Sequence, residues 1–292
     1  MRFATLELNG KTVPVIVSPD GTGYAPASGW LDAPFDGDMS DLIARCLQPA
    51  GQPAPSAWQP LAGLRLRAPL VPRRNVFCVG KNYHEHAAEF ARSGFDTSAA
   101  KGETAPSAPV VFTKAPSTVV GTGDEVLSFS NLTQQLDYEA ELAVVIGKPG
   151  RGIRAEDAWD HVWGYTVVND VTARDLQQKH RQWFIGKSMD TFCPMGPWIV
   201  TADELDATDL PVKCWINDEL RQDANTRDLI FDIPTIIATL SAGMTLQPGD
   251  VIATGTPAGV GIGFSPPRFL APGDRMRIEI GGIGVLENRI AG

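Results

Sequence analysis

The sequence predicts a β-rich α+β protein, and three observations support that fold class. Glycine and proline are both abundant, with 29 and 23 residues among 292, which favours short strands and turns over long helices. Strand-like apolar runs recur along the chain, whereas segments with a helical period are few. A regular alternation of strands and helices is absent, which argues against a doubly wound parallel sheet. We therefore expect strands that fold over on one another.

The first 70 residues predict a small N-terminal α+β module. The runs FATLEL and TVPVIV predict two strands joined by Asn9 and Gly10, a pair that accepts the positive φ angles of a type I′ turn. The segment SDLIARCLQ predicts a short helix with Ser40 as its cap. Residues 49–60 are too rich in proline for either element.

Residues 71–292 predict a larger, strand-rich domain. Its expected strands are NVFCVG, APVVFTK, LAVVIG, WGYTVVND, GPWIVTA, KCWIND, DVIATGT and DRMRIEI, and its expected helices are NYHEHAAEFARSG, TARDLQQKH and DIPTIIATLSAG. For the first helix we expect Asn82 as the N-cap, Glu85 to complete a capping box, and Gly94 to follow the last turn.

Charge and composition exclude several classes of function. The formal net charge of −9 argues against a general binder of nucleic acid or anionic membranes, because both need a basic surface. No apolar run approaches the ~18–20 residues that would span a bilayer, and the N-terminus lacks the apolar core of a signal peptide. The cysteines are scattered without a CxxC pair, which favours reduced thiols in the cytoplasm over disulfides or a zinc site.

An acidic stretch precedes the apolar run 142–146. Asp137, Glu139 and Glu141 are spaced by two, so a strand would place them on one face, where they repel unless a cation lies among them. Asp170 ends another apolar strand. Together, Glu139, Glu141 and Asp170 would offer hard oxygen ligands that favour Mg²⁺ or Mn²⁺ and leave about three positions open. The alternatives are an exposed acidic strand face and a helix-capping aspartate.

Two further segments carry candidate catalytic groups. His86 and Glu89 stand at i and i+3 on the first predicted helix, where the glutamate would fix the histidine tautomer and raise its basicity. The alternative is a surface ion pair, and His84 competes for the role. Lys187 lies among aromatic and apolar neighbours and is a candidate site lysine, although a lysine at a strand end is more often solvated.

Two loops complete the candidate site. The segment RSGFDTSAAKGETAPSAP is small, polar and rich in turn residues, which is typical of a mobile lid. The segment ATGTPAGVG, residues 253–261, is a glycine-rich loop whose backbone N–H groups could bind a carboxylate, or it is a plain turn.

Taken together, these residues resemble the fumarylacetoacetate hydrolase family. The matching strings follow in the family's order over roughly residues 72–290: GKNYHEHAAE, DYEAELAVVIG, GYTVVNDVTARDLQ, KSMDTFCPMGPWIV, IPTIIATLSAGMTLQPGDVIATGTPAGVG and GDRMRIEI. The resemblance implies a mixed β-sandwich roll, here with the small N-terminal α+β module before it, and a homodimer with a Mg²⁺ or Mn²⁺ site.

The resemblance also implies roles for particular residues. It assigns the metal ligands to Glu139, Glu141 and Asp170, the catalytic dyad to His86 and Glu89, and the lysine that faces the substrate to Lys187. The substrate contacts implied by the motifs fall on Lys81, Tyr83, Arg174, Gln177 and Thr256. The resemblance leaves Asp137 without a role.

From these parts we expect hydrolysis of a C–C bond in an acylpyruvate or another 2,4-diketo acid. His86 would deprotonate a water that attacks the distal carbonyl, Lys187 would polarise that carbonyl or hold a carboxylate, and the metal would stabilise the enolate that leaves. The alternatives on the same site are decarboxylation of oxaloacetate and tautomerisation or hydration of an unsaturated 2-oxo diacid. A structural or regulatory metal-binding protein without catalysis is a third class. The expected partner is a small 2-oxo acid, with no nucleic acid or membrane.

Overall fold

The computed structural model describes residues 1–29, 31, 35–46, 54–94 and 106–292. Parts of two predicted segments therefore lie outside the described residues: residues 95–105 of the predicted lid, and residues 47–53, which cover the end of the first predicted helix and the start of the proline-rich stretch. Within the described residues, no helix combines the length and apolarity that crossing a membrane requires.

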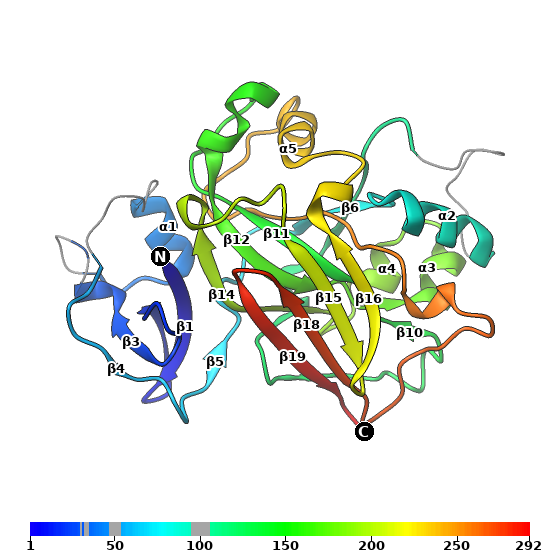
Figure 1. Ribbon diagram of the computed structural model, residues 1–292, viewed down its shortest axis with the longest axis horizontal. Helices are drawn as coiled ribbons and strands as arrows, with labels where there is room; N and C mark the ends of the chain where they lie inside the picture. The colour runs from blue at the N-terminus through cyan, green and yellow to red at the C-terminus, as the bar shows by residue number, and fades with distance from the viewer. Residues whose placement is uncertain (30, 32–34, 47–53, 95–105) are drawn as a thin grey trace.

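A twelve-stranded sheet forms the centre of the described structure (Figure 1). Its path runs β4–β3–β2–β1–β14–β12–β11–β17–β6–β7, with β5 beside β1 and β8 beside β14. Its strands are β1 (Arg2–Leu8), β2 (Lys11–Val17), β3 (Gly23–Pro26), β4 (Gln59–Pro60), β5 (Leu66–Arg67), β6 (Val76–Gly80), β7 (Val110–Lys114), β8 (Val119–Val120), β11 (Ala140–Ile146), β12 (Val162–Asn169), β14 (Cys193–Thr201) and β17 (Val251–Ala253).

A second sheet of five strands lies in front of the middle of the large sheet in Figure 1. Its order is β16–β15–β18–β19–β9, and a two-stranded ladder, β10–β13, stands apart. These strands are β9 (Glu125–Val126), β10 (Leu136–Asp137), β13 (Thr172–Ala173), β15 (Pro211–Ile216), β16 (Glu219–Asn225), β18 (Arg275–Ile280) and β19 (Gly284–Ile290). The β-rich α+β prediction, with sheets packed face to face, is confirmed.

Strand β11 shows why one apolar run is buried on both faces. Alternate side chains of a strand point to opposite faces. Leu142 and Val144 pack into the core shared with the five-stranded sheet. Ala143 and Val145 pack into a second core that includes helix α1 (Met39–Arg45). A continuous apolar run is the pattern expected for a strand covered on both sides.

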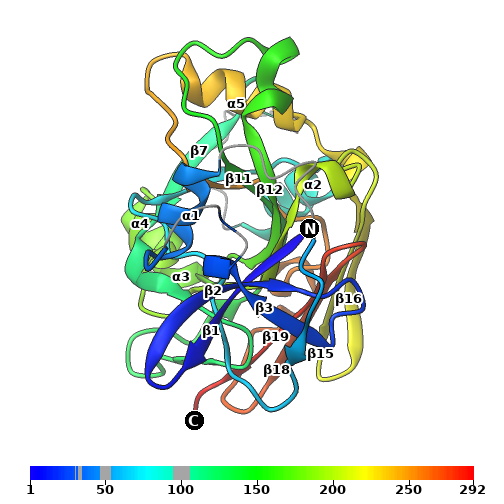
Figure 2. The same cartoon turned by 90° about the vertical axis from the view of Figure 1, so that its left-hand side faces the viewer.

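The N-terminal strands extend the large sheet. Asn9 and Gly10 adopt φ angles of 52° and 74°, which confirms the predicted tight turn between β1 and β2. Strand β1 also pairs with β14, with Phe3 opposite Ile199. Figure 2 shows these strands on the side of the molecule that faces the viewer. The division into a module of residues 1–70 and a domain of residues 71–292 stays a prediction.

Two predicted helix caps are wrong, and both have a physical reason. Helix α1 is capped by Asp38, whose side chain accepts from Asp41 N, so Ser40 lies inside the first turn. Helix α2 (His84–Ser93) has Tyr83 as its N-cap with no side-chain hydrogen bond. The Asn82 side chain is instead used between segments distant in sequence: its amide donates to Thr254 O at 2.7 Å and to Phe231 O at 3.0 Å. A capping motif is local and cannot reveal such a competing contact.

The remaining helices fall where the sequence predicts them. Gly94 ends α2 with a φ of 78°, as expected for a left-handed C-cap. Helices α3 (Arg174–His180) and α5 (Ile233–Ser241) match their predicted segments, and α4 (Phe184–Lys187) is a further single turn. The short 3₁₀ helices are η1 (Ala27–Gly29), η2 (Pro116–Thr118), η3 (Ala155–His161), η4 (Ala202–Glu204), η5 (Thr226–Asp228) and η6 (Gly261–Gly263).

We predict that Gly164→Ala destabilises the protein by about 1–3 kcal/mol, the usual cost of overpacking. Gly164 lies in β12, and a Cβ there would lie 2.3 Å from Val200 O on the neighbouring strand. Gly243→Ala is the matched control, because no atom lies within 4 Å of its Cβ position; we expect it to be neutral or stabilising by up to ~1 kcal/mol. Urea unfolding followed by tryptophan fluorescence measures both, and equal losses would contradict the packing described.

Candidate active site

Strand register brings the three predicted metal ligands together. Glu139 lies between β10 and β11, and Glu141 lies in β11. Asp170 follows β12, which pairs antiparallel with β11, and its backbone N donates to Glu139 O at 2.9 Å. One carboxylate oxygen from each of the three residues lies within 4.8 Å of the others, and all three residues are buried. Burial excludes the alternative of an exposed acidic strand face.

The three carboxylates lie in unequal electrostatic environments. Burial opposes ionisation of Glu139, but Lys187 and Arg174 outweigh it and lower the pKa of Glu139 to about 2. Among the described residues, no lysine or arginine nitrogen lies within 4 Å of Glu141, whose Oε2 accepts from Gly255 N at 2.8 Å. Burial and the charges of Asp170 and Glu139 therefore raise the pKa of Glu141 well above its usual range.

Lys187 is part of this cluster and not a solvated surface lysine. Its Nζ lies 2.8 Å from Glu139 Oε2 and 2.7 Å from Asp170 Oδ2, and the residue is 1% exposed. Burial opposes its charge, yet Asp170 and Glu139 raise the pKa of the ammonium. Gly186 permits this position: a Cβ there would lie 2.5 Å from Gln177 N, so only glycine lets α4 pack so closely on α3.

Lys114 is a second lysine bonded to Asp170, and no sequence motif marks it. It is the last residue of β7, and its Nζ lies 2.6 Å from Asp170 Oδ1 and 3.0 Å from Val171 O. The sequence signal is weak, because a lysine at the end of an edge strand is ordinarily explained by solvent exposure. The contact to Asp170 joins residues 56 positions apart.

The predicted dyad forms on α2. His86 Nδ1 lies 3.1 Å from Glu89 Oε2, and His86 is buried, which excludes an ordinary surface ion pair. His84, the competing candidate, is exposed. The other carboxylate oxygen of Glu89, Oε1, accepts a hydrogen bond from Gly259 N at 3.0 Å. With Glu89 ionised, Nδ1 donates to it, which leaves the Nε2 lone pair to accept a proton.

His86 of the dyad and two of the carboxylates, Glu139 and Glu141, line one small pocket. All of the predicted catalytic and substrate-binding residues line it except Glu89 and Tyr83, and apolar and aromatic side chains complete its wall. The lining residues are Val79, Gly80, Lys81, His86, Phe90, Phe112, Glu139, Glu141, Arg174, Gln177, Trp183, Lys187 and Thr256. Asp170 does not line the pocket and is bonded to both Lys114 and Lys187. Tyr83 is buried beside Leu229, with which it forms an isolated β-bridge.

Arg174 carries an unsatisfied donor in the wall of this pocket. Its Nε donates to Asp137 Oδ2 at 2.9 Å, and its Nη1 lies 2.7 Å from Glu139 Oε1 and 3.2 Å from Gln177 Oε1. Its Nη2 is buried and has no hydrogen-bond partner. A buried, unpaired guanidinium N–H is costly, and a ligand carboxylate would satisfy it.

Backbone N–H groups of the glycine-rich loop bind carboxylates, as predicted, but these carboxylates are side chains of the protein itself. Gly255 N donates to Glu141, Gly259 N to Glu89, and the N–H groups of Gly261 and Ile262 to Asp137. The loop thus fixes side chains on three different elements.

The residues fit a hard divalent cation. Three buried carboxylates with oxygens in mutual reach are the donor set that Mg²⁺ and Mn²⁺ prefer, and no histidine or cysteine belongs to the described cluster. A bound dication would also favour the ionised form of Glu141, whereas burial and the neighbouring carboxylates alone raise its pKa.

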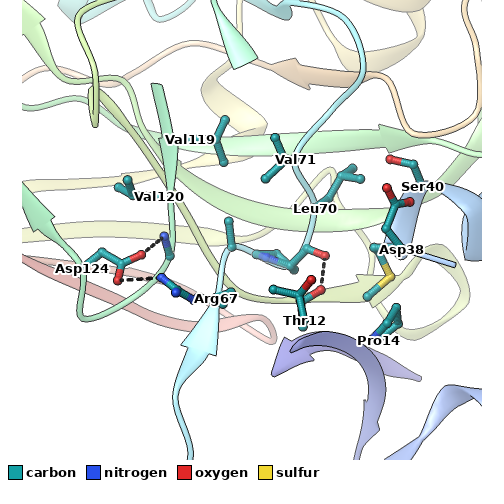
Figure 3. Close-up of a pocket in the computed structure, with 15 residues that line it drawn as sticks. Thr12, Pro14, Asp38, Ser40, Arg67, Leu70, Val71, Val119, Val120 and Asp124 are labelled. Carbon is teal, nitrogen blue, oxygen red and sulfur yellow. Dashed lines mark hydrogen bonds and ion pairs between the residues drawn. The ribbon is translucent and has the colours of Figure 1, made fainter. Parts of the chain in front are cut away.

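A second cavity, of about 360 Å³, lies away from this site (Figure 3). It opens between the N-terminal strands, the start of α1 and β8, and contains none of the predicted site residues. Its arginine, Arg67, already pairs with Glu7 and lies near Asp124.

We predict opposite effects of Glu141→Gln with and without metal. Without metal, Glu141→Gln raises Tm, because the native state disfavours the ionised form of Glu141. The pKa of Glu141 in the native state lies above its ordinary value of 4.5, so the stability of the wild type falls as pH rises past 4.5. Mg²⁺ or Mn²⁺ stabilises the wild type, by about 2.7 kcal/mol at 100 times Kd, and stabilises the variant far less. Differential scanning calorimetry across pH tests both halves. A metal-dependent rise in Tm that Glu141→Gln leaves intact would contradict the assignment.

The sequence matches a known family and its curated relatives. Residues 75–291 match the family model of the fumarylacetoacetate (FAA) hydrolase C-terminal domain. The chain is 53% identical over 232 residues to oxaloacetate tautomerase YisK of Bacillus subtilis, covering 79% of this chain and 74% of that protein. It is 42% identical over 232 residues to the mitochondrial oxaloacetate tautomerase fahd2 of Xenopus laevis, covering 78% and 69%.

A solved structure shows the same architecture. The fumarylacetoacetate hydrolase from the psychrophile Exiguobacterium antarcticum matches with a TM-score of 0.86 at 41% identity, covering 100% of this chain and 99% of that one. The family model spans the residues that carry the carboxylate cluster and the dyad. The chain therefore belongs to the fumarylacetoacetate hydrolase family.

Proposed function

We propose that this protein is a Mg²⁺- or Mn²⁺-dependent tautomerase that interconverts the keto and enol forms of oxaloacetate. The observation that carries the proposal is that one pocket is lined by members of four features. These are the carboxylate cluster, the histidine–glutamate pair, the buried ammonium of Lys187, and Arg174 with its unpaired guanidinium N–H. Two relatives named as oxaloacetate tautomerases support this reaction over the C–C hydrolysis expected from the sequence.

The reaction needs only a proton relay. In going from keto to enol, the C3–H bond breaks and its electron pair forms the C2=C3 bond, while the C2 carbonyl pair moves to oxygen, which gains a proton. No water is consumed. His86 suits the proton transfer, because Glu89 holds its Nδ1 at 3.1 Å and directs the basic Nε2 away from that contact.

Charge that develops on the C2 oxygen is stabilised by groups already in place. Lys187 stays protonated, since Asp170 and Glu139 raise the pKa of its ammonium. Glu139, Glu141 and Asp170 would hold the divalent ion, which when bound supplies Lewis-acid stabilisation of an enolate. Arg174 Nη2 would pair with a substrate carboxylate and orient the diacid.

Hydrolysis of a 2,4-diketo acid is the second candidate. The buried His86–Glu89 pair favours it, because the same general base could activate a water. The two reactions differ in what they consume: hydrolysis takes up one water and breaks a C–C bond, whereas tautomerisation does neither.

The proposal predicts metal-dependent exchange of the C3 protons of oxaloacetate with solvent. In D₂O with Mg²⁺, proton NMR should show loss of the C3 signal well above the spontaneous rate, and a chelator should abolish the enzymatic part. His86→Gln should lower this rate by ~10²-fold or more, the usual share of a general base. His84→Gln is the matched control on the same helix and should retain the wild-type rate, since His84 is exposed.

Four outcomes would overturn parts of this proposal. Full exchange by His86→Gln would remove His86 from the proton transfer. Faster release of pyruvate from an acylpyruvate than exchange of oxaloacetate would favour the hydrolase, and release of CO₂ at the rate of exchange would favour a decarboxylase. Silence on every substrate, with metal bound, would favour a protein without catalysis.

A further inference from the structure

Asp137 is a buried carboxylate that the proposed mechanism does not use. It lies in β10, is 0% exposed, and is not one of the three residues whose oxygens form the metal cluster. Its two oxygens accept four hydrogen bonds. Oδ1 accepts from Tyr138 N at 2.9 Å and Gly261 N at 2.6 Å, and Oδ2 accepts from Arg174 Nε at 2.9 Å and Ile262 N at 3.1 Å.

The bond to Arg174 determines which guanidinium nitrogen is left without a partner. Asp137 holds Nε, and Glu139 and Gln177 lie within reach of Nη1, so Nη2 is left as the unpaired donor. Without the bond to Asp137, the guanidinium could rotate about its side-chain torsions, and Nη2 would lose its fixed direction.

The bonds to Gly261 and Ile262 act on the dyad. These residues open η6, and the same loop donates Gly259 N to Glu89 Oε1 at 3.0 Å. The loop approaches Glu89 so closely that a Cβ on Gly263 would lie 1.8 Å from that oxygen. Asp137 therefore holds the loop that fixes Glu89, and Glu89 in turn orients His86.

The bonding pattern requires a carboxylate at this position. All four groups that face Asp137 are N–H donors. Asparagine has nearly the same shape, but its NH₂ group would face two N–H groups in either orientation and leave buried donors unpaired.

We propose that Asp137 is a positioning residue that fixes the substrate-binding Arg174 and the His86–Glu89 pair in position relative to each other. This inference rests on the proposed function for its kinetic readout, but its geometry does not depend on which reaction follows. Asp137 neither belongs to the metal cluster nor lines the pocket itself, so it acts through Arg174 and the η6 loop.

The test is a double-mutant cycle on oxaloacetate exchange with Mg²⁺ present. We expect Asp137→Asn to raise KM at least tenfold and to lower kcat at least tenfold, because it frees both Arg174 and the η6 loop. Arg174→Lys should raise KM by a similar factor, and the double variant should show a KM no worse than the weaker-binding single variant. Multiplicative effects on KM would overturn the proposal, since they would mean that Asp137 acts independently of Arg174.

Asp250→Asn is the matched control for a merely structural role. Asp250 is likewise buried and accepts from Arg74 Nε at 3.0 Å and from the backbone N of Gln247 at 2.6 Å, but it precedes β17 at the end opposite the pocket. We expect Asp250→Asn to lower Tm while KM and kcat stay within twofold of wild type. Equal kinetic losses in both variants would show that Asp137 is only structural.

Two further measurements keep the proposal testable if Asp137→Asn does not fold or if the proposed function is wrong. Gly263→Ala displaces Glu89, whose side-chain atoms are the nearest to the added Cβ, and should lower kcat at least tenfold with KM within twofold. An unchanged kcat would overturn the inference that the η6 loop positions Glu89. Calorimetric titration with oxalate and Mg²⁺ needs no turnover. Oxalate affinity at least tenfold weaker in Asp137→Asn, but not in Asp250→Asn, supports the positioning role even where oxaloacetate is not a substrate, and equal affinities would overturn it.

Discussion

Four buried acids, in β10 and at the ends of β11 and β12, are the constraint on which the rest of the site depends. Asp137, Glu139, Glu141 and Asp170 are all at most 5% exposed, and ionised carboxylates at that depth are costly unless cations or N–H donors surround them. Arg174 and Lys187 meet three of these acids, and Lys114 adds a second cation to Asp170. Glu141 has a backbone donor, and a divalent ion would supply the charge that it lacks.

Each neutralising group comes from a different element, which ties the architecture to the chemistry. Lys187 lies on α4, which packs closely onto α3 at Gly186, and Lys114 lies on the edge strand β7. The glycine-rich loop after β17 turns its N–H groups toward Glu89, Glu141 and Asp137. A loop that satisfies three carboxylates on three elements also holds the dyad and the metal cluster at a constant separation.

The parts of the site that the sequence predicts are those set by local spacing. Glu139 and Glu141 follow from strand alternation, and His86 and Glu89 from helical spacing, so both pairs are readable without a structure. The β-rich fold follows from short apolar runs and from turn residues, and the Asn9–Gly10 turn follows from its φ requirement. All of these inferences need only the nearest few residues.

The contacts that the sequence does not reveal are long-range. Lys114 reaches Asp170 across 56 positions, and Asp137 reaches Gly261 across 124, so neither partner is marked by a nearby motif. The same limit explains why Asn82 was misassigned as a cap: its amide bonds to Thr254, 172 positions away. Strand alternation also placed Asp137 with the metal ligands, whereas the break between β10 and β11 turns it toward Arg174.

Direct counting of bound ions tests the central claim that Glu139, Glu141 and Asp170 form one divalent-cation site. Electron paramagnetic resonance of free Mn²⁺, titrated into the purified protein, measures both stoichiometry and affinity. We predict one tightly bound Mn²⁺ per chain, displaced by Mg²⁺, with that binding lost when Glu139 and Asp170 are both replaced by their amides. Binding of Mn²⁺ that is no tighter in the wild type than in this double variant would contradict the account.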